Sequence, residues 1–166
     1  MTAAPVPMPA PWKPSVTVAV IVERDGRFLM VEEETPEGVR LNQPAGHLDP
    51  GESLVDAAIR EALEETARVF TPMALLGVYM ARSASAYEHQ PVTYVRFAFT
   101  GAVGESEPGR KLDDGILRTL WMTPEEVRTW NDKHRSPLVM KCVDDYLAGQ
   151  RYPLSAIFVH PSVVLL

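Results

Sequence analysis

The sequence predicts an α+β domain in which helices cover a β-sheet. Apolar segments typical of strands are interspersed with helical ones, an Asp25-Gly26 pair is typical of a tight hairpin, and residues 53–66 have a clear helical period. Hairpins mixed with longer crossovers indicate an α+β arrangement. With 166 residues the chain fits one domain and can bury roughly two-thirds of its unfolded surface.

Six segments have the apolar composition of strands. They cover residues 15–23, 27–31, 39–44, 75–81, 93–100 and 118–122. Helices are predicted over 53–66, from Thr123-Pro124 and from Ser136-Pro137 to near Gly149, because each begins with a typical capping residue or proline. The segments between these elements are predicted to be polar loops, and they cover 32–38, 82–90 and 101–114.

The organisation outside these elements is simple. Residues 1–12 are rich in proline and predict a flexible arm, and residues 13–166 predict one domain that ends in an irregular apolar tail. No apolar run approaches the length of a membrane span, and the N-terminus lacks the apolar centre of a signal peptide. Cys142 is the single cysteine, which excludes a disulfide framework. We therefore expect a cytoplasmic protein with no membrane partner.

The net charge of −6 argues against nucleic acid as a partner, because such binding depends on neutralising phosphates. Small phosphorylated molecules remain compatible with this charge, since a metal ion can supply the positive charge. Nothing in the composition separates a monomer from a homodimer.

The helix over 53–66 has two contrasting faces. On a helical wheel one arc is apolar, and it consists of Val55, Ala58, Ile59, Ala62 and Leu63. The opposite arc holds Glu61, Glu64 and Glu65, and like charges at this spacing destabilise a helix by roughly 0.2–0.5 kcal/mol per pair. One interpretation is a solvated face on which Arg60 pairs with Glu64. The other is an all-oxygen site, which suits Mg²⁺ or Mn²⁺ far better than zinc.

The residues around this helix resemble the Nudix box, G-x5-E-x7-R-E-U-x-E-E-x-G-U, in which U is a bulky apolar residue. The matching positions are Gly46, Glu52, Arg60, Glu61, Glu64 and Glu65. The sequence departs from the pattern at Ala62, Ala67 and Arg68. Ala67 replaces the late glycine, which predicts a helix that ends without a left-handed glycine or runs slightly further.

The resemblance implies the Nudix fold, a mixed sheet sandwiched between helices, and a Mg²⁺-dependent hydrolase for which Mn²⁺ could substitute. It implies that Glu64, Glu65 and the Gly46 carbonyl bind the metal. Glu61 would be either another ligand or the group that orients and deprotonates the attacking water. Arg60 and Glu52 would hold these glutamates in place through charge-assisted hydrogen bonds.

Further segments are similar to a narrower branch, the bacterial NudJ-type phosphatases. They are KPSVTVAVIV at 13–22, LNQPAGHL at 41–48, RSPLV at 135–139 and GQRYPL at 149–154. This likeness implies hydrolysis of hydroxymethylpyrimidine pyrophosphate, thiamin pyrophosphate and nucleoside di- and triphosphates, with release of phosphate. Two alternatives remain: a general nucleotide pyrophosphatase, and a Nudix-fold domain that senses a ligand without catalysis.

Several residues outside the box are candidate substrate contacts. Arg40 and Arg96 are candidates for phosphate, although a strand surface would also account for them. Gln43, with its neighbour Asn42, could hydrogen-bond a pyrimidine edge. Asp114, like the adjacent Asp113, stands where many Nudix enzymes add an acidic residue, and surface solvation is the alternative. Aromatic residues could stack on a base or pack in the core, and these are Tyr79, Tyr87 and Tyr94.

Overall fold

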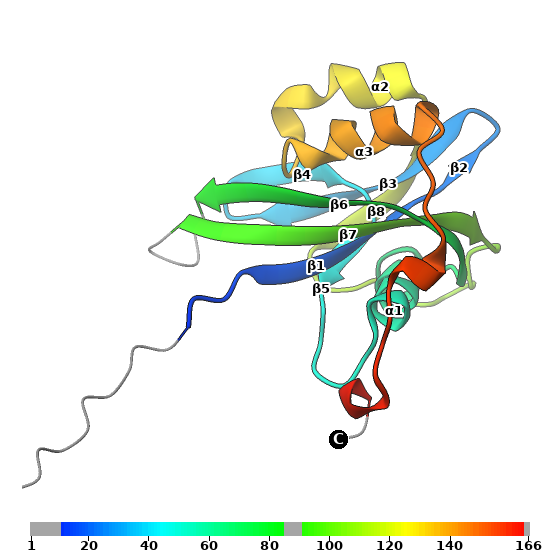
Figure 1. Cartoon of the computed structure of the whole chain (residues 1–166). Helices are drawn as coiled ribbons and strands as arrows, with labels where there is room; N and C mark the ends of the chain where they lie inside the picture. Colours follow the sequence, from blue (N-terminus) through cyan, green and yellow to red (C-terminus); the bar gives the residue numbers. More distant parts are fainter. Residues whose placement is uncertain (1–10, 85–90, 165–166) are drawn as a thin grey trace, which may run out of the picture.

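The computed structural model describes residues 11–84 and 91–164, in which two sheets lie between helices (Figure 1). The first sheet has the strand order β5-β1-β7-β6. Its strands are β5 (Ala45–His47), β1 (Ser15–Ile21), β7 (Pro91–Val103) and β6 (Phe70–Ala84). β1 runs parallel to β7, whereas β5 and β6 pair antiparallel with their neighbours. The α+β class predicted from the sequence and the mixed sheet implied by the Nudix resemblance are confirmed.

The second sheet is built on β3, which pairs with strands on both sides. It contains β2 (Glu23–Arg24), β3 (Arg27–Thr35), β4 (Gly38–Asn42) and β8 (Ile116–Met122). The predicted hairpin at Asp25-Gly26 is confirmed, since both residues have the positive φ that this tight turn requires, 52° and 76°.

The prediction of a polar loop at 32–38 is wrong over its first half. Glu32, Glu33 and Glu34 continue β3, because β4 and β8 supply hydrogen-bonding partners on both edges. Glu32 is buried and its carboxylate accepts a hydrogen bond from Arg118 on β8. Charged side chains therefore occupy a strand where their partners come from distant segments. The predicted loop at 82–90 is also shorter, since β6 extends to Ala84, and residues 85–90 lie outside the described residues.

The helices cover opposite faces of the sheets: α1 (Leu54–Thr66) lies on one side and α2 (Pro124–Thr129) with α3 (Leu138–Leu147) on the other (Figure 1). The predicted capping box of α2 is confirmed, with Thr123 and Glu126 each bonding the other's backbone N–H. Short 3-10 turns follow at Asn131–Lys133, Leu154–Ala156 and Pro161–Val163. Each helix layer encloses its own hydrophobic core, one with Ala58, Ala62 and Phe99 under α1, the other with Met30 and Val139 under α3.

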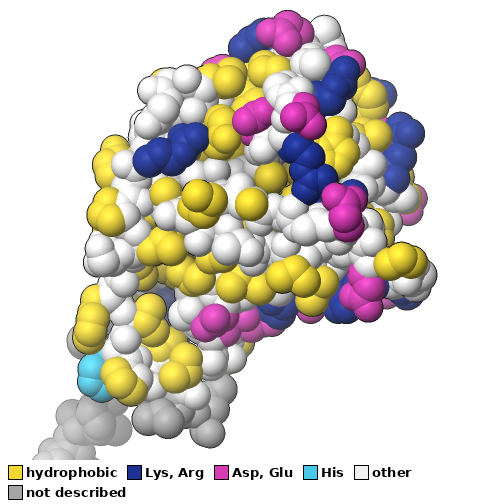
Figure 2. All heavy atoms as spheres, turned by 90° about the vertical axis from the view of Figure 1, so that its right-hand side faces the viewer, with side chains coloured by type: hydrophobic (Ala, Val, Ile, Leu, Met, Phe, Trp, Pro, Cys, Tyr) yellow, Lys and Arg dark blue, Asp and Glu magenta, His cyan; other side chains and the backbone are white. Residues whose placement is uncertain are grey.

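The C-terminal segment returns to the edge of the first sheet. The backbone of Tyr152 exchanges two hydrogen bonds with that of Leu75 on β6. Large exposed hydrophobic side chains concentrate on β6 and this segment, including Met73, Met80 and Phe158. Figure 2 shows hydrophobic side chains spread over one face of the molecule, with charged groups gathered towards its upper and right-hand parts. No helix among residues 11–84 and 91–164 is long and apolar enough to span a membrane.

Candidate active site

Helix α1 carries the central side chains, and its start is fixed by the sequence. Ser53 is the N-cap, and its hydroxyl accepts a hydrogen bond from the Asp56 backbone N–H. The helix ends at Ala67, which adopts the left-handed conformation with φ 55° and donates its N–H to the Leu63 carbonyl. The helix thus ends as one ending in glycine would, although an alanine is strained in this conformation.

The carboxylate face of α1 is partly buried. Glu61 and Glu65 are each only 7% exposed, because β5 passes over this face. A Cβ at Gly46 on β5 would lie 2.1 Å from Oε1 of Glu61, so only glycine permits this close approach. The backbone N–H of Ala45 donates to Oε2 of Glu65 at 2.9 Å. Of the two interpretations of the acidic arc, the solvated face therefore does not hold for Glu61 and Glu65, since the sheet covers both.

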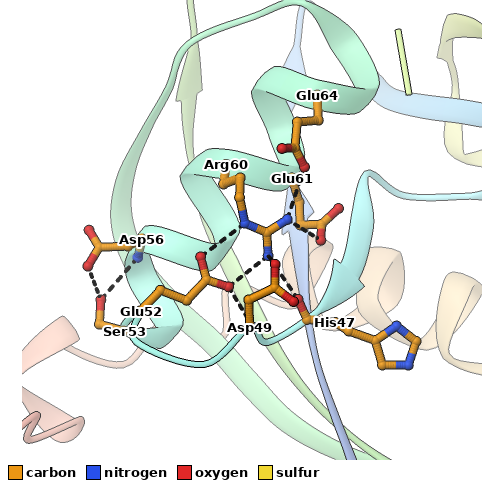
Figure 3. A network of polar contacts seen from close by, with 8 residues as sticks. All are labelled: His47, Asp49, Glu52, Ser53, Asp56, Arg60, Glu61 and Glu64. Carbon is orange, nitrogen blue, oxygen red and sulfur yellow. Dashed lines mark hydrogen bonds and ion pairs between the residues drawn. The ribbon is translucent and has the colours of Figure 1, made fainter. Parts of the chain in front are cut away.

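Arg60 lies at the centre of a polar network with several acidic partners (Figure 3). Its Nε and Nη2 donate to the two carboxylate oxygens of Glu52 at 3.0 and 2.7 Å. Its Nη1 donates to Glu61 at 2.8 Å and to Glu64 at 2.9 Å, and its Nη2 also donates to the His47 carbonyl. The His47 ring points away from Arg60 (Figure 3). One guanidinium thus ties the loop before α1 to two glutamates of the helix.

The carboxylates differ in their electrostatic environments. The hydrogen bond from Arg60 lowers the pKa of Glu52, whereas burial raises the pKa of Glu61 despite the same arginine. Burial, reinforced by the charges of Glu61, Glu33 and Asp113, raises the pKa of Glu65 to about 9. Glu61 and Glu65 are therefore carboxylates that lack sufficient positive charge nearby.

A cavity of about 440 Å³ is lined in part by β5, the strand that covers this face of α1. Its lining includes Glu33, Asn42, Gly46, His47, Tyr94 and Arg96. Gly46 belongs to both the cavity wall and the Glu61 contact, so the cavity lies next to the carboxylates. Its volume is within the range of small-molecule sites.

Arg96 is buried at 6% exposure rather than displayed on a strand surface. Its Nη1 and Nη2 are 3.4 Å from the amide oxygens of Gln43 and Asn42, respectively. Burial lowers the pKa of Arg96, and the contact with the Cys142 thiol opposes this effect. Arg96 therefore makes long bonds to neutral groups and lines a cavity that a ligand can enter.

The other residues predicted to contact the substrate do not line the cavity, and these are Gln43, Arg40 and Asp114. Gln43 is buried and donates to the Val139 carbonyl at 2.7 Å, so its amide is used within the core. Arg40 is not among the residues that line the cavity, and its Nη1 is 3.4 Å from the Val39 carbonyl. Asp114 is exposed and pairs with Lys111 at 2.8 Å. Asp113 is nearer to the site, because its N–H donates to the Glu64 carbonyl and its charge acts on Glu61 and Glu65.

Among the tyrosines, Tyr94 lines the cavity and Tyr79 is buried with its hydroxyl bonded to Asp145. Tyr87 lies outside the described residues. Sequence reasoning missed Glu33 and Arg135 of the cavity wall. Neither residue had a distinguishing signal in the sequence, since Glu33 stands in a run of three glutamates that is typical of a polar loop.

The candidate metal ligands are oxygen atoms only. Within residues 11–84 and 91–164, no three His, Cys, Asp or Glu side chains are arranged to hold a metal ion. Glu61 and Glu64 are instead turned onto Arg60. The donor chemistry still fits a hard divalent cation, since buried carboxylates short of positive charge lie beside the Gly46 backbone.

Comparison with known proteins identifies the family of this chain. The NUDIX domain family matches residues 11–142. Phosphatase NudJ of Escherichia coli strain K12 is 37% identical over 146 residues, covering 88% of this chain and 92% of that protein, and Phosphatase NudJ of Shigella flexneri has the same values. A NUDIX hydrolase from Nitrosomonas europaea superposes with a TM-score of 0.81 at 48% identity, covering 90% of this chain and 99% of the other. The chain therefore belongs to the NUDIX domain family and is a Nudix hydrolase, an enzyme that acts on small molecules.

Proposed function

We propose that this enzyme hydrolyses phosphoanhydride bonds of small diphosphates in a Mg²⁺-dependent reaction and releases phosphate. The observation that carries the proposal is the contact between Gly46 and Glu61, which joins a carboxylate cluster to a cavity of about 440 Å³. A diphosphate bound across this junction would place its phosphates near the carboxylates and the rest of the molecule in the cavity.

The chain has suitable residues for a divalent cation, Mg²⁺ or Mn²⁺. Glu64, Glu65 and the Gly46 carbonyl would hold it, with Glu61 as a further ligand or as the base. Glu64 is the most accessible of the three glutamates, with 36% of its side chain exposed. When bound, the cation would neutralise the charge of the diphosphate and favour deprotonation of the attacking water.

Arg60 and Glu52 have a positioning role in this proposal. Arg60 binds both oxygens of Glu52 and one oxygen each of Glu61 and Glu64, so it fixes the directions in which the helix glutamates point. Arg96 is the proposed contact for the substrate on the cavity side, because it is a buried cation whose hydrogen bonds, among the residues that the structure describes, go to neutral groups.

The likeness to Phosphatase NudJ supports a phosphatase with small substrates. We propose hydroxymethylpyrimidine pyrophosphate, thiamin pyrophosphate and nucleoside di- and triphosphates as these substrates. The alternative within the same chemistry is a general nucleotide pyrophosphatase.

A substrate panel tests the proposal. Release of phosphate and of pyrophosphate is measured with Mg²⁺ on hydroxymethylpyrimidine pyrophosphate, thiamin pyrophosphate, ATP, GTP, CTP and ADP-ribose. We expect the highest kcat/KM on the thiamin-related diphosphates, with phosphate as product. Similar low rates on every nucleotide would favour the general pyrophosphatase, and no turnover of any compound by the folded protein would contradict both.

A further inference from the structure

Glu33 places a carboxylate in the cavity wall with one oxygen fully engaged. Its Oε1 accepts from Arg135 Nε at 3.2 Å and from Asn42 Nδ2 at 3.4 Å. Within residues 11–84 and 91–164, Oε2 of Glu33 has no hydrogen-bond or ion-pair partner. A carboxylate oxygen accepts hydrogen bonds and cannot donate them, so Oε2 is available to accept a hydrogen bond from a ligand that enters the cavity.

The charge of Glu33 is only partly compensated by its surroundings. Burial raises the pKa of its carboxyl, although the positive charges of Arg135 and Arg96 oppose that rise. A hydrogen-bond donor at Oε2 would therefore stabilise this carboxylate, whereas an oxygen acceptor such as a carbonyl or phosphate would be repelled.

We propose that Glu33 is a specificity-determining residue that binds the exocyclic amine of an aminated ring in the substrate. The ligand class is the phosphates of aminopyrimidines and related amino-bearing rings. This inference rests on the proposed function, and it adds which ring edge the cavity selects. The remaining N–H of the Asn42 amide lies beside Glu33 and suits the ring nitrogen next to such an amine.

The cavity has the size and the walls for a planar ring. Its volume of about 440 Å³ exceeds what one base requires, and the rings of His47 and Tyr94 both line it. These two rings are 6.1 Å apart and tilted by 56°, so they offer aromatic surface on the side of the cavity that adjoins Gly46. Stacking on such surfaces is indifferent to the base, which leaves discrimination to Glu33.

A binding experiment with CMP and UMP tests this proposal, because the two differ at the ring edge in question. Calorimetry in the presence of Mg²⁺ should give the wild type about tenfold tighter binding of CMP. In Glu33→Gln the preference should fall below about threefold, since an amide both donates and accepts. Glu34→Gln is the matched control, because Glu34 is the exposed neighbour on the same strand and should keep the wild-type preference.

A modified ligand gives a second test that needs no variant. CMP with two methyl groups on its exocyclic nitrogen has no donor there, so its affinity for the wild type should drop to that of UMP. Equal binding of CMP and UMP, an unchanged preference in Glu33→Gln, or no binding of either nucleotide would overturn the role of Glu33. None of these measurements needs turnover, so hydrolysis without a CMP preference would refute Glu33 alone, and a preference without hydrolysis would refute the proposed function alone.

Discussion

Two arginines on opposite sides of Gly46 have contrasting environments. Arg60 keeps 27% of its side chain exposed, yet it binds the carboxylates of Glu52, Glu61 and Glu64 directly. Arg96 is buried at 6% exposure, and within residues 11–84 and 91–164 its contacts are amide oxygens at 3.4 Å and the Cys142 thiol, while the charges of Glu33 and Glu65 also act on it. The charge of the accessible Arg60 is therefore offset by carboxylates in direct contact, whereas the charge of the buried Arg96 is not.

We infer from this difference that the two arginines have different roles. The hydrogen bonds that Arg60 donates to its carboxylate partners raise its pKa, which is the effect of a group that holds its neighbours in place. Burial lowers the pKa of Arg96, which is the effect of a charge held away from water without a full counter-charge. We infer that Arg60 maintains the catalytic face and that Arg96 acts on what enters the cavity.

The largest expected effect comes from a carboxylate that Arg60 positions. Glu64→Gln should lower kcat by at least about two orders of magnitude with the fold intact, because it removes the charge of a proposed metal ligand. Phosphate release at saturating Mg²⁺ measures the loss, and circular dichroism checks the fold. Near-wild-type turnover would exclude Glu64 from the site.

Exchanging each arginine for methionine sharpens the comparison. Arg60→Met should raise the Mg²⁺ concentration for half-maximal rate by about 10- to 100-fold, because the hydrogen bonds that orient the glutamates are lost. Arg96→Met should leave this Mg²⁺ concentration unchanged and raise KM instead. Titrations of Mg²⁺ and of substrate on both variants distinguish the effects. If both variants shifted the half-maximal Mg²⁺ concentration and KM by the same factors, the two arginines would not have separate roles.

Gly46 joins the two regions, and its substitution tests that junction. Gly46→Ala should lower kcat by about tenfold or more with little loss of stability, because its Cβ would meet the flexible end of Glu61 at 2.1 Å. Gly104→Ala is the matched control, since a Cβ there meets nothing within 4 Å and the backbone φ is not positive. The two variants should have similar Tm values, and equal kcat values would argue against the contact.

The smallest effect concerns Cys142, which contacts Arg96 from α3. Burial raises the pKa of its thiol from about 8.5 in a free cysteine to about 11. The folded state holds this proton more tightly, so the contribution to stability is present below about pH 8.5 and is lost as the pH rises towards about 11. A thiol-specific disulfide reagent at pH 8 should label the protein only as it unfolds, and rapid labelling of the native protein would contradict this burial.

The sequence predicted the part of the site in which the interactions are local. The glutamates that Arg60 binds lie within eight residues of it, so helix periodicity and the Nudix box were sufficient to group them. The cavity was harder, because Arg96 and Asn42 are 54 residues apart and meet through the pairing of β1 with β5 and β7. Composition alone could not reveal that Glu33 continues a strand or that Arg135 meets it, because only the tertiary structure brings them together.

The most direct test of the central claim is Mn²⁺ binding, measured by the electron paramagnetic resonance signal of the free ion. It asks whether the carboxylates that Arg60 positions hold a divalent cation, and it needs no substrate. We predict that the wild type and Glu34→Gln bind Mn²⁺ equally and that Glu64→Gln binds it at least about tenfold more weakly. Equal Mn²⁺ affinity in all three proteins would contradict the assignment of the α1 glutamates as the metal site.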